Sequence, residues 1–493
     1  MKKLFIPALG ALSFLASCNF LEKQPLVSLT PENFFTSGAD AEASITACYD
    51  ALQGTGAYGQ DLNVMGEMPS DNCTSTNGDV NAMDKIIWTP TTTQVGNVYR
   101  QGYIGVNRAN IVLKYVPAVP MDTARRRQIL GEARFIRALS YFNMARVYGG
   151  VPLRLTPTES GAPSDVNLAR STTDQVYDQV VADLQAAAVQ MPNPGQNQNR
   201  ATKNAAYALL ARVQLTRRNW AAAQAAASSV IGASLAASFK SLYPAENQAR
   251  TTESLFEIQY AGSADGGSIL PDLLLPAPLA TYSFPKFNIP TAELLTYADT
   301  VNDRRWAYNG IVRAPNGSTV VGRDHVSYID GRSTNGNDQG PFVYKWTSIG
   351  NNFSSNDNTY VLRYAEVLLA LAEASNEQSG PTPTALNALN QVRQRAGLTL
   401  LQANSPQAAT KQTLRNEIDR QRRLELAFEG ERWFDLLRYA RHTQADASAT
   451  HAVTALDIIA QQRVGARDVN YLVFPIPQSE TNTNPLIQQN PGY

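Results

Sequence analysis

Two glutamates and an arginine lie on one face of a predicted helix. Glu425, Glu429 and Arg432 are spaced by four and three residues, which brings side chains together on a helix surface. Glycoside hydrolases use two carboxylates, held ~5–9 Å apart on either side of the scissile bond. Here both carboxylates project from one helix, and arginines that can pair with them lie close by, namely Arg422, Arg423 and Arg438. We therefore expect a structural ion-pair network at this face and no catalysis.

Aromatic side chains in polar, irregular segments could do a second kind of chemistry, the binding of saccharides. A sugar presents C–H patches to an exposed aromatic ring, and its hydroxyl groups pair with amide, carboxylate or guanidinium groups beside the ring. The aromatic candidates are Trp88, Tyr282, Phe284, Trp306 and Phe353, within a wider set that includes Tyr308, Tyr328 and Trp346. The polar candidates, taken from the hydrophilic segment 70–90 near Trp88, are Asp71, Asn72 and Asn81. For any single aromatic residue we favour packing inside the protein, whereas as a group we expect one or more of them to contact a ligand.

Other motifs give weaker evidence for a functional site. The string Gly54–Gly59 fits the G-x-G-x-x-G pattern of dinucleotide sites, but such sites follow a strand, and residues 45–52 predict a helix. We expect a flexible loop there. The histidines lack zinc spacing, and the sequence has no C-x-x-C or G-x-S-x-G motif. Calcium could be bound through acidic groups, namely Asp71, Asp79 and Asp84, or Asp330 and Asp338, but solvated loop carboxylates are commoner, so we expect no cofactor and leave calcium open.

The first residues indicate export. Lys2 and Lys3 precede a short uncharged run, 4–14, which is too short to span a bilayer and is typical of a signal peptide. The sequence Leu15-Ala16-Ser17-Cys18 resembles a bacterial lipobox. By that resemblance, residues 1–17 are removed and Cys18 becomes the acylated first residue, with an ordinary signal peptide as the alternative. Several acyl chains would anchor the protein to a membrane that it does not cross.

Charge and cysteine content limit the partners. Lys plus Arg and Asp plus Glu both number 42, and only 17% of residues are charged. No global field would therefore attract nucleic acid, and the composition suits a protein that works among neutral solutes. Besides Cys18 only Cys48 and Cys73 remain, and we favour buried thiols over a disulfide between them.

Apolar periodicity predicts a mostly α-helical chain. The expected helices are 97–116, 122–148 with an Asp122 or Thr123 cap, one from Thr172 or Thr173 to Met191, 201–217, 220–231, 358–377, 384–396, 410–428 and 431–441. Ala211 and Ala223 lie twelve residues apart, as small residues do in the helix pairs of tetratricopeptide repeats.

The same pass along the chain predicts its organisation. An extended lead, 18–37, precedes an N-terminal helical part, 38–234. Gly, Pro, Ser and Asn dominate 235–357, which predicts an irregular, ligand-side lobe with short strands. Residues 358–493 return to helices and end in an extended tail from Tyr471.

Several segments together resemble the SusD/RagB family. They are the lead from Cys18 with Pro31-Glu32-Asn33-Phe34-Phe35, the helix Gly131-Glu132-Ala133-Arg134-Phe135 running to Tyr148-Gly149-Gly150-Val151-Pro152, Arg200-Ala201-Thr202-Lys203, Arg363-Tyr364-Ala365-Glu366, Glu429-Gly430-Glu431-Arg432-Trp433-Phe434-Asp435 and Gln489-Asn490-Pro491-Gly492-Tyr493. These blocks follow the family's order and span nearly the whole chain, which makes the resemblance specific.

The resemblance implies about four tetratricopeptide-like helix pairs with the irregular lobe against them. It implies a non-enzymatic, outward-facing lipoprotein of the outer membrane that captures glycans and passes them to a SusC-like TonB-dependent barrel. Capture of peptides or other nutrients is the alternative, and a hydrolase that uses Glu425 or Glu429 is a third hypothesis. The resemblance is thinnest in the lobe, so the sequence leaves the nutrient unidentified.

Overall fold

The computed structural model describes residues 34–193, 200–243, 251–276, 279–280, 282, 284–307, 340–346, 353–463 and 465–493, and the backbone of 311–313, 319–321 and 326–330. The predictions for the signal peptide, for Cys18 and for most of the lead 18–37 lie outside the described residues.

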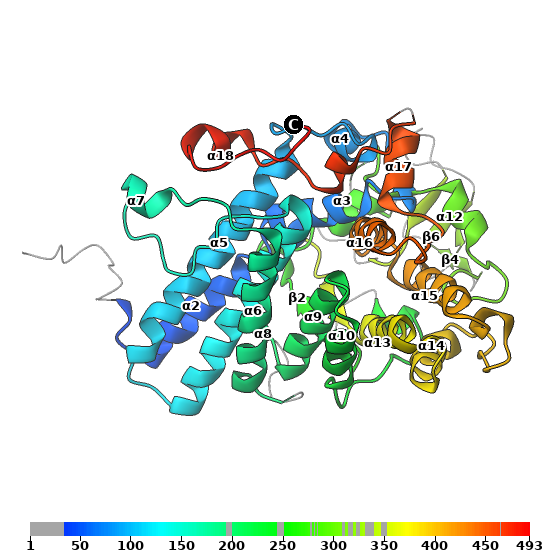
Figure 1. Cartoon of the computed structure of the whole chain (residues 1–493), viewed down its shortest axis with the longest axis horizontal. Helices are drawn as coiled ribbons and strands as arrows, with labels where there is room; N and C mark the ends of the chain where they lie inside the picture. The colour runs from blue at the N-terminus through cyan, green and yellow to red at the C-terminus, as the bar shows by residue number, and fades with distance from the viewer. Residues whose placement is uncertain are drawn as a thin grey trace, which may run out of the picture.

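Long helices pack side by side in one continuous row that curves across the molecule (Figure 1). In chain order they are α2 Gly38–Asp50, α5 Thr93–Tyr115, α6 Thr123–Tyr148, α8 Thr173–Gln190, α9 Lys203–Thr216, α10 Trp220–Ser228, α13 Tyr364–Ser379, α14 Pro383–Arg395 and α15 Lys411–Leu426. A further long helix, α16 Arg432–Ala445, packs against shorter helices beside this row. Shorter helices join them, namely α3 Asp61–Glu67, α4 Asn81–Asp84, α7 Pro163–Val166, α11 Leu270–Leu274, α12 Ala292–Tyr297, α17 Ala455–Gln462 and α18 Gln478–Thr483. The predicted tetratricopeptide-like, mostly helical fold is confirmed.

Local sequence explains where several of these helices begin and how they pack. The Asp122 side chain accepts a hydrogen bond from the Arg125 amide and caps α6, and Thr172 caps α8 in a reciprocal capping box. Ala211 of α9 and Ala223 of α10 are both buried, which confirms the predicted close contact between these two helices. The small side chains let the helix backbones approach each other.

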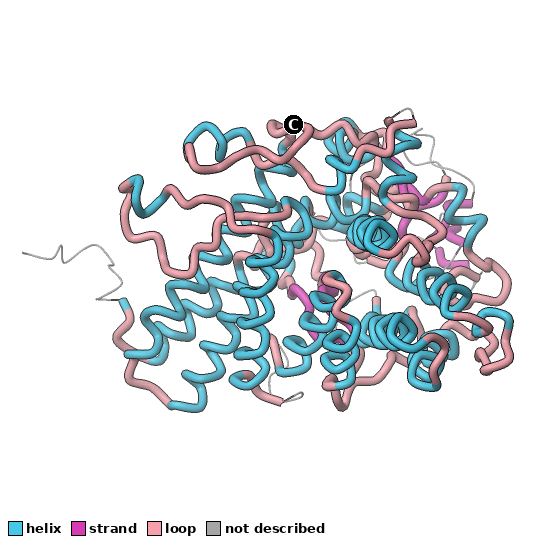
Figure 2. The backbone as a smooth tube through the Cα atoms, viewed as in Figure 1, coloured by secondary structure: helices cyan, strands magenta, loops and turns pink. Residues whose placement is uncertain are grey.

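The strands are short, and they lie partly against the helices at the centre of the molecule and partly at the side that carries α12 (Figure 2). β2 (Ser254–Ile258) pairs with β8 (Thr359–Arg363), and β1 (Cys73–Thr74) pairs with β3 (Ile289–Pro290), both antiparallel. The other strands, β4 Ile311–Arg313, β5 Thr319–Val321, β6 Val326–Asp330 and β7 Pro341–Val343, form an antiparallel sheet in sequence order. The predicted short strands are therefore present between the helical parts.

Three local predictions are wrong. Residues 359–363 form a buried strand, because Thr359, Tyr360 and Val361 favour β-structure and pair with β2, so the helix begins only at Tyr364. Residues Thr55–Gly59 form a π-helical turn instead of a flexible loop, and a Cβ on Gly56 would lie 2.2 Å from the Asn97 carbonyl oxygen of α5. The tail contains α18, so it is not extended throughout.

Apolar side chains form a large part of the interior, beside a set of buried charged groups. Cys48 and Cys73 are buried free thiols, which confirms the favoured interpretation over a disulfide. Trp88 packs against Trp433 and Phe474 in the core beneath the C-terminal tail. Within the described part of the chain, every helix is either too short or too polar to cross a bilayer.

Candidate functional site

An aromatic cluster on the irregular lobe brings together three of the residues selected from the sequence. The rings of Tyr282 and Phe353 stack with centroids 5.2 Å apart and planes 10° from parallel. The Phe284 ring lies 6.2 Å from that of Phe353. Tyr282 is 43% exposed, whereas Phe284 and Phe353 are half-buried. The cluster thus offers a supported aromatic ring to solvent.

Backbone pairing positions a polar loop beside this cluster. Strand β1 pairs with β3, and the loop that follows β1 stays attached to the segment before β3. Ser75 Oγ donates a 2.7 Å hydrogen bond to the Lys286 carbonyl oxygen, and Asn77 Nδ2 donates a 2.8 Å bond to that of Pro285. Amide, hydroxyl and carboxylate groups of residues 75–79 therefore lie next to the segment that carries Phe284.

A buried lysine holds the aromatic segment from below. Lys286 is 3% exposed, and its ammonium group donates a 3.0 Å hydrogen bond to the Tyr282 carbonyl oxygen. The same ammonium lies 4.0 Å from the centroid of the Phe284 ring, a cation–π contact. One charged group thereby fixes both aromatic residues, so the exposed ring is held in place before any ligand arrives.

Phe353, which supports the Tyr282 ring, has an unfavourable backbone conformation. Its φ is +60°, in the left-handed region that bulky residues rarely adopt and that costs on the order of 1–3 kcal/mol. Such strain persists where the surrounding structure requires it, and here the strained residue carries the lower ring of the stack.

Asp71 and Asn72 are engaged in structural contacts. The Asp71 carboxylate accepts hydrogen bonds of 2.7 and 2.8 Å from Arg432. Asn72 is fully buried, donates to Glu67 Oε1 at 2.9 Å and accepts from Arg423 Nε at 2.9 Å. Both side chains therefore connect the segment before β1 to the C-terminal helices.

The candidate tryptophans are buried. Trp88 and Trp306 pack inside the protein and do not serve as the ligand contacts for which they were candidates, because they are 2% and 0% exposed. The Trp88 indole N–H donates to Tyr493 Oη at 2.7 Å, which explains its burial beneath the tail. Neither ring has a free face on which a sugar could stack. Asn81 is exposed and begins α4, at the far end of the polar loop.

The remaining candidates lie elsewhere or outside the described residues. Tyr308 and Asp338 are outside the described residues, and for Tyr328 and Asp330 only the backbone is described. Trp346 is buried and donates its indole N–H to the Asn358 carbonyl oxygen. Among the side chains that the structure describes, no three acidic, histidine or cysteine groups gather as a metal site would require.

Glu425 and Glu429 lie in a buried ion-pair network, as predicted, but the predicted single helix face is wrong, because α15 ends at Leu426 and Glu429 lies in the turn before α16. Glu425 is fully buried and pairs with Arg305 at 2.9 Å and with Arg363 and Arg395. Glu429 pairs with Arg363 at 2.8 Å and with Lys345 at 2.6 Å. Arg432 contributes to a different contact from the one expected, because it pairs with Asp71.

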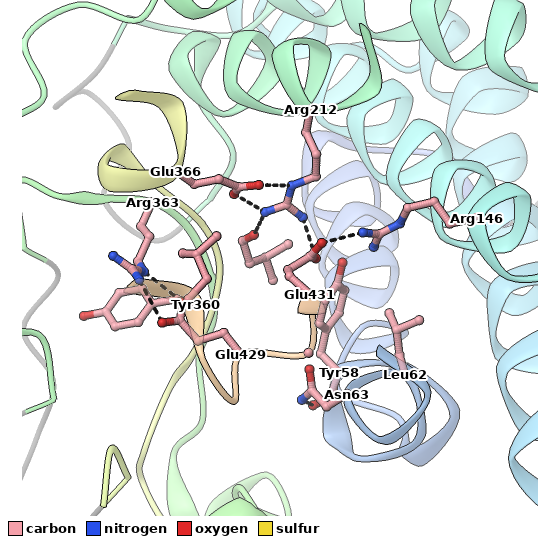
Figure 3. Close-up of a pocket in the computed structure, with 13 residues that line it drawn as sticks. Tyr58, Leu62, Asn63, Arg146, Arg212, Tyr360, Arg363, Glu366, Glu429 and Glu431 are labelled. Carbon is pink, nitrogen blue, oxygen red and sulfur yellow. Dashed lines mark hydrogen bonds and ion pairs between the residues drawn. The ribbon is translucent and has the colours of Figure 1, made fainter. Parts of the chain in front are cut away.

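A second group of ion pairs continues from this network, and Figure 3 shows the part around Glu431. Glu431 accepts from Arg146 at 2.6 Å and from Arg212 at 2.9 Å, and Arg212 also pairs with Glu366 (Figure 3). Burial raises the pKa of Glu366, but the charges of Arg212 and Arg422 outweigh it and hold the pKa at about 2. The cavity among these side chains measures about 10 Å³, so it has room for at most a single water molecule. The network binds helices to one another and leaves no space for a substrate.

The sequence did not reveal Asn77 or Lys286 as part of the site. Asn77 belongs to the hydrophilic segment from which Asp71, Asn72 and Asn81 were selected, and the turn-forming sequence Asn77-Gly78-Asp79 was its available signal. Lys286 had no signal, because a lysine between Pro285 and Phe287 gives no indication of burial.

Known proteins are similar to this chain in sequence and in fold. The profile of the SusD family matches residues 296–493, and a second profile, described as starch-binding associating with outer membrane, matches residues 19–215. SusD-like protein P2 of Formosa agariphila is 26% identical over 100% of both chains. The starch-binding protein SusD of Bacteroides thetaiotaomicron is 25% identical over 87% of this chain and 84% of its own.

A solved structure shows the same fold. The laminarin binding SusD-like protein superposes with a TM-score of 0.73 at 24% identity, over 93% of this chain and 100% of that one. The two profiles together match most of the sequence, at both ends of the helical row. The chain therefore belongs to the SusD/RagB family of outer-membrane-associated binding proteins, which are not enzymes.

Proposed function

We propose that the chain is a cell-surface lipoprotein that captures oligosaccharides and delivers them to a TonB-dependent outer-membrane barrel. The observation that carries the proposal is the exposed ring of Tyr282, stacked on Phe353 and bordered by the polar loop 75–79. Two similar proteins support a glycan ligand by their names, the starch-binding SusD of Bacteroides thetaiotaomicron and the laminarin binding SusD-like protein.

Capture at this cluster requires no bond to break. The apolar face of a sugar ring covers Tyr282, and its hydroxyl groups exchange hydrogen bonds with the amide and hydroxyl groups of residues 75–79. Because Phe353 and Lys286 already hold the aromatic segment, little ordering is required on binding. A few exposed contacts support affinities in the micromolar to millimolar range.

Acylation at Cys18 is the anchor in this proposal. The extended lead 18–37 connects the acylated residue to α2, the helical parts 38–234 and 358–493 form the scaffold, and the lobe 235–357 carries the ligand. The protein covers a SusC-like barrel from outside the cell and releases the oligosaccharide into it. Affinity purification of the acylated chain from detergent-solubilised membranes tests the partner, because a barrel transporter is expected in stoichiometric amount. Recovery of the chain alone contradicts the delivery step.

Affinity electrophoresis in gels that contain single polysaccharides tests the capture step. We expect laminarin or starch to retard the mature chain, and Tyr282→Ala to weaken that retardation. A tyrosine has an area of ~200 Å² to bury, and the 43% of Tyr282 that is exposed corresponds to ~85 Å². If a sugar covered all of this area, its burial at ~25 cal/mol/Å² would contribute at most ~2 kcal/mol to the binding free energy. The expected loss is about 5- to 30-fold in affinity.

A matched control uses another stacked aromatic pair. Tyr115 stacks on Phe35 at 5.3 Å and 10°, at the end of α5 and distant in sequence from the lobe. Tyr115→Ala is therefore expected to leave retardation unchanged. Absence of retardation by every polysaccharide, combined with tight binding of a peptide library, would contradict the proposal and support peptide capture.

A further inference from the structure

A second hollow of ligand size lies far from the aromatic cluster in sequence, along the side of α5. Its volume is about 770 Å³, within the ~300–1,000 Å³ range of small-molecule sites. The floor is the face of α5 that carries Asn97, Arg100 and Tyr103. One wall is the segment 152–166, which includes α7, and the other is α18 (Figure 1). We call this hollow the α5 groove.

The floor of the α5 groove is held in place by its own hydrogen bonds. Asn97 Nδ2 donates to Asp61 at 2.8 Å, and Arg100 Nη2 donates to Asn97 Oδ1 at 2.5 Å. Tyr103 Oη donates to the Pro152 carbonyl oxygen at 2.7 Å and ties the floor to the wall. A guanidinium group has five N–H donors, so Arg100, which is exposed, keeps several for a ligand.

The opposite wall carries a carboxylate with no cation beside it. Glu480 is partly buried, and in the described part of the chain no side chain or amide donates a hydrogen bond to its carboxylate. Burial raises the pKa of Glu480, and no nearby positive charge opposes this effect. A carboxylate that has lost part of its hydration without gaining donors gains most from a ligand that supplies hydroxyl groups.

The mixed charge of the α5 groove selects the class of ligand. An anion would be repelled by Glu480, and a cation would meet Arg100, Arg108 and Arg154. A sugar hydroxyl both donates and accepts, so one neutral ring can give hydrogen bonds to Glu480 and receive them from Arg100. In the floor, Tyr99 is 3% exposed and Tyr103 is half-buried, so recognition here relies mainly on hydrogen bonds.

We infer that the α5 groove is a second saccharide-binding site, which holds a neutral sugar between the Arg100 guanidinium and the Glu480 carboxylate. The inference builds on the proposed glycan-capture function but uses residues that the aromatic cluster does not share. Two sites on one chain would hold a long polysaccharide with an avidity above that of either site alone.

Hydrogen–deuterium exchange of the mature chain, with and without laminarihexaose or maltoheptaose, tests both sites separately. We expect slower exchange in 96–108 and 478–484 for the α5 groove, and in 284–290 for the aromatic cluster. Glu480→Gln is expected to remove the protection of the groove, with about five- to tenfold weaker binding there, and to leave 284–290 protected. Asp178→Asn removes an exposed carboxylate of α8, outside the lining of the groove, that pairs with Arg217, and it is the matched control, with no expected effect.

Each outcome decides between the proposals. Protection of 284–290 alone overturns the second site and keeps the proposed function. Protection of 96–108 that survives both Glu480→Gln and Arg100→Ala overturns the assigned contacts. Protection at neither place with either oligosaccharide overturns the second site and counts equally against glycan capture. Groove protection that persists in Tyr282→Ala, and disappears in Glu480→Gln with an unchanged circular dichroism spectrum, supports the inference.

Discussion

Replacing Glu425 by glutamine keeps the shape of the side chain and removes one charge from a balanced buried cluster. The cations of that cluster are Arg305, Arg363, Arg395 and Lys345. The four carboxylates that pair with them belong to Glu425, Glu429, Glu253 and Asp303. Glu425→Gln therefore leaves four positive charges against three negative ones in the protein interior.

The size of the effect follows from burial. Glu425, Arg305 and Arg363 expose no more than 2% of their side chains, so water cannot replace the lost partner. Breaking a buried ion pair by removing one member costs about 3–5 kcal/mol, a large share of the ~5–15 kcal/mol that stabilises a typical domain. The comparable change at Glu293, whose side chain is 59% exposed and pairs with Arg423, is expected to cost less than ~1 kcal/mol.

Urea unfolding followed by circular dichroism measures both variants on the same scale. Glu425→Gln is expected to lower the unfolding midpoint strongly and Glu293→Gln only slightly. If the two variants unfold at the same urea concentration as the wild type, the structural role assigned to Glu425 is wrong. Glycan hydrolysis by the wild type that a folded Glu425→Gln variant lacks would refute the reasoning completely, because it would make the carboxylate catalytic.

Three further outcomes are expected. Burial raises the pKa of Asp435, but the charges of Arg422 and Arg438 outweigh this effect and hold the pKa at about 2, below the ordinary 3.8. The ionised carboxylate therefore contributes about 2 kcal/mol to the free energy of unfolding near neutral pH, and this contribution is lost as the pH falls from about 4 towards 2. Urea midpoints at pH 5, 4 and 3 that do not decrease would contradict this prediction. Trp88→Phe removes the hydrogen bond to Tyr493 and is expected to lower stability by about 1–3 kcal/mol with unchanged glycan affinity, whereas a selective loss of affinity would make Trp88 a ligand contact. Cys18→Ser is expected to move the chain from the membrane to the soluble fraction and to abolish incorporation of radiolabelled palmitate, and retention in the membrane would exclude acylation at this residue as the anchor.

Local patterns predicted the helical scaffold well. The helix expected at 122–148 with an Asp122 cap is α6, Thr123–Tyr148, and the pair expected at 201–217 and 220–231 is α9 and α10. Caps, periodicity and small residues act within a few positions of one another, so a sequence records them directly. The ion-pair role of Glu425 and Glu429 was also predicted correctly, but the shared helix face from which it was predicted does not exist, because α15 ends at Leu426 and Glu429 lies in the turn before α16.

Features that depend on contacts between segments far apart in the sequence could not be predicted. Trp88 looked exposed because its neighbours are polar, but its partner Tyr493 lies 405 residues away. Asn72 is buried by Arg423 of α15, and the strand at residues 359–363 is completed by pairing with β2, about a hundred residues earlier in the chain. The cluster of Tyr282, Phe284 and Phe353 was selected by composition alone, and its stacking geometry depends on tertiary packing that no local pattern contains.

A crystal structure of the mature chain with a saccharide that it binds in solution tests the central claim most directly. The account predicts electron density for a sugar ring lying flat over the exposed face of Tyr282, with hydroxyl groups within hydrogen-bond distance of residues 75–79. A bound saccharide that leaves Tyr282 and Phe353 uncovered would contradict it.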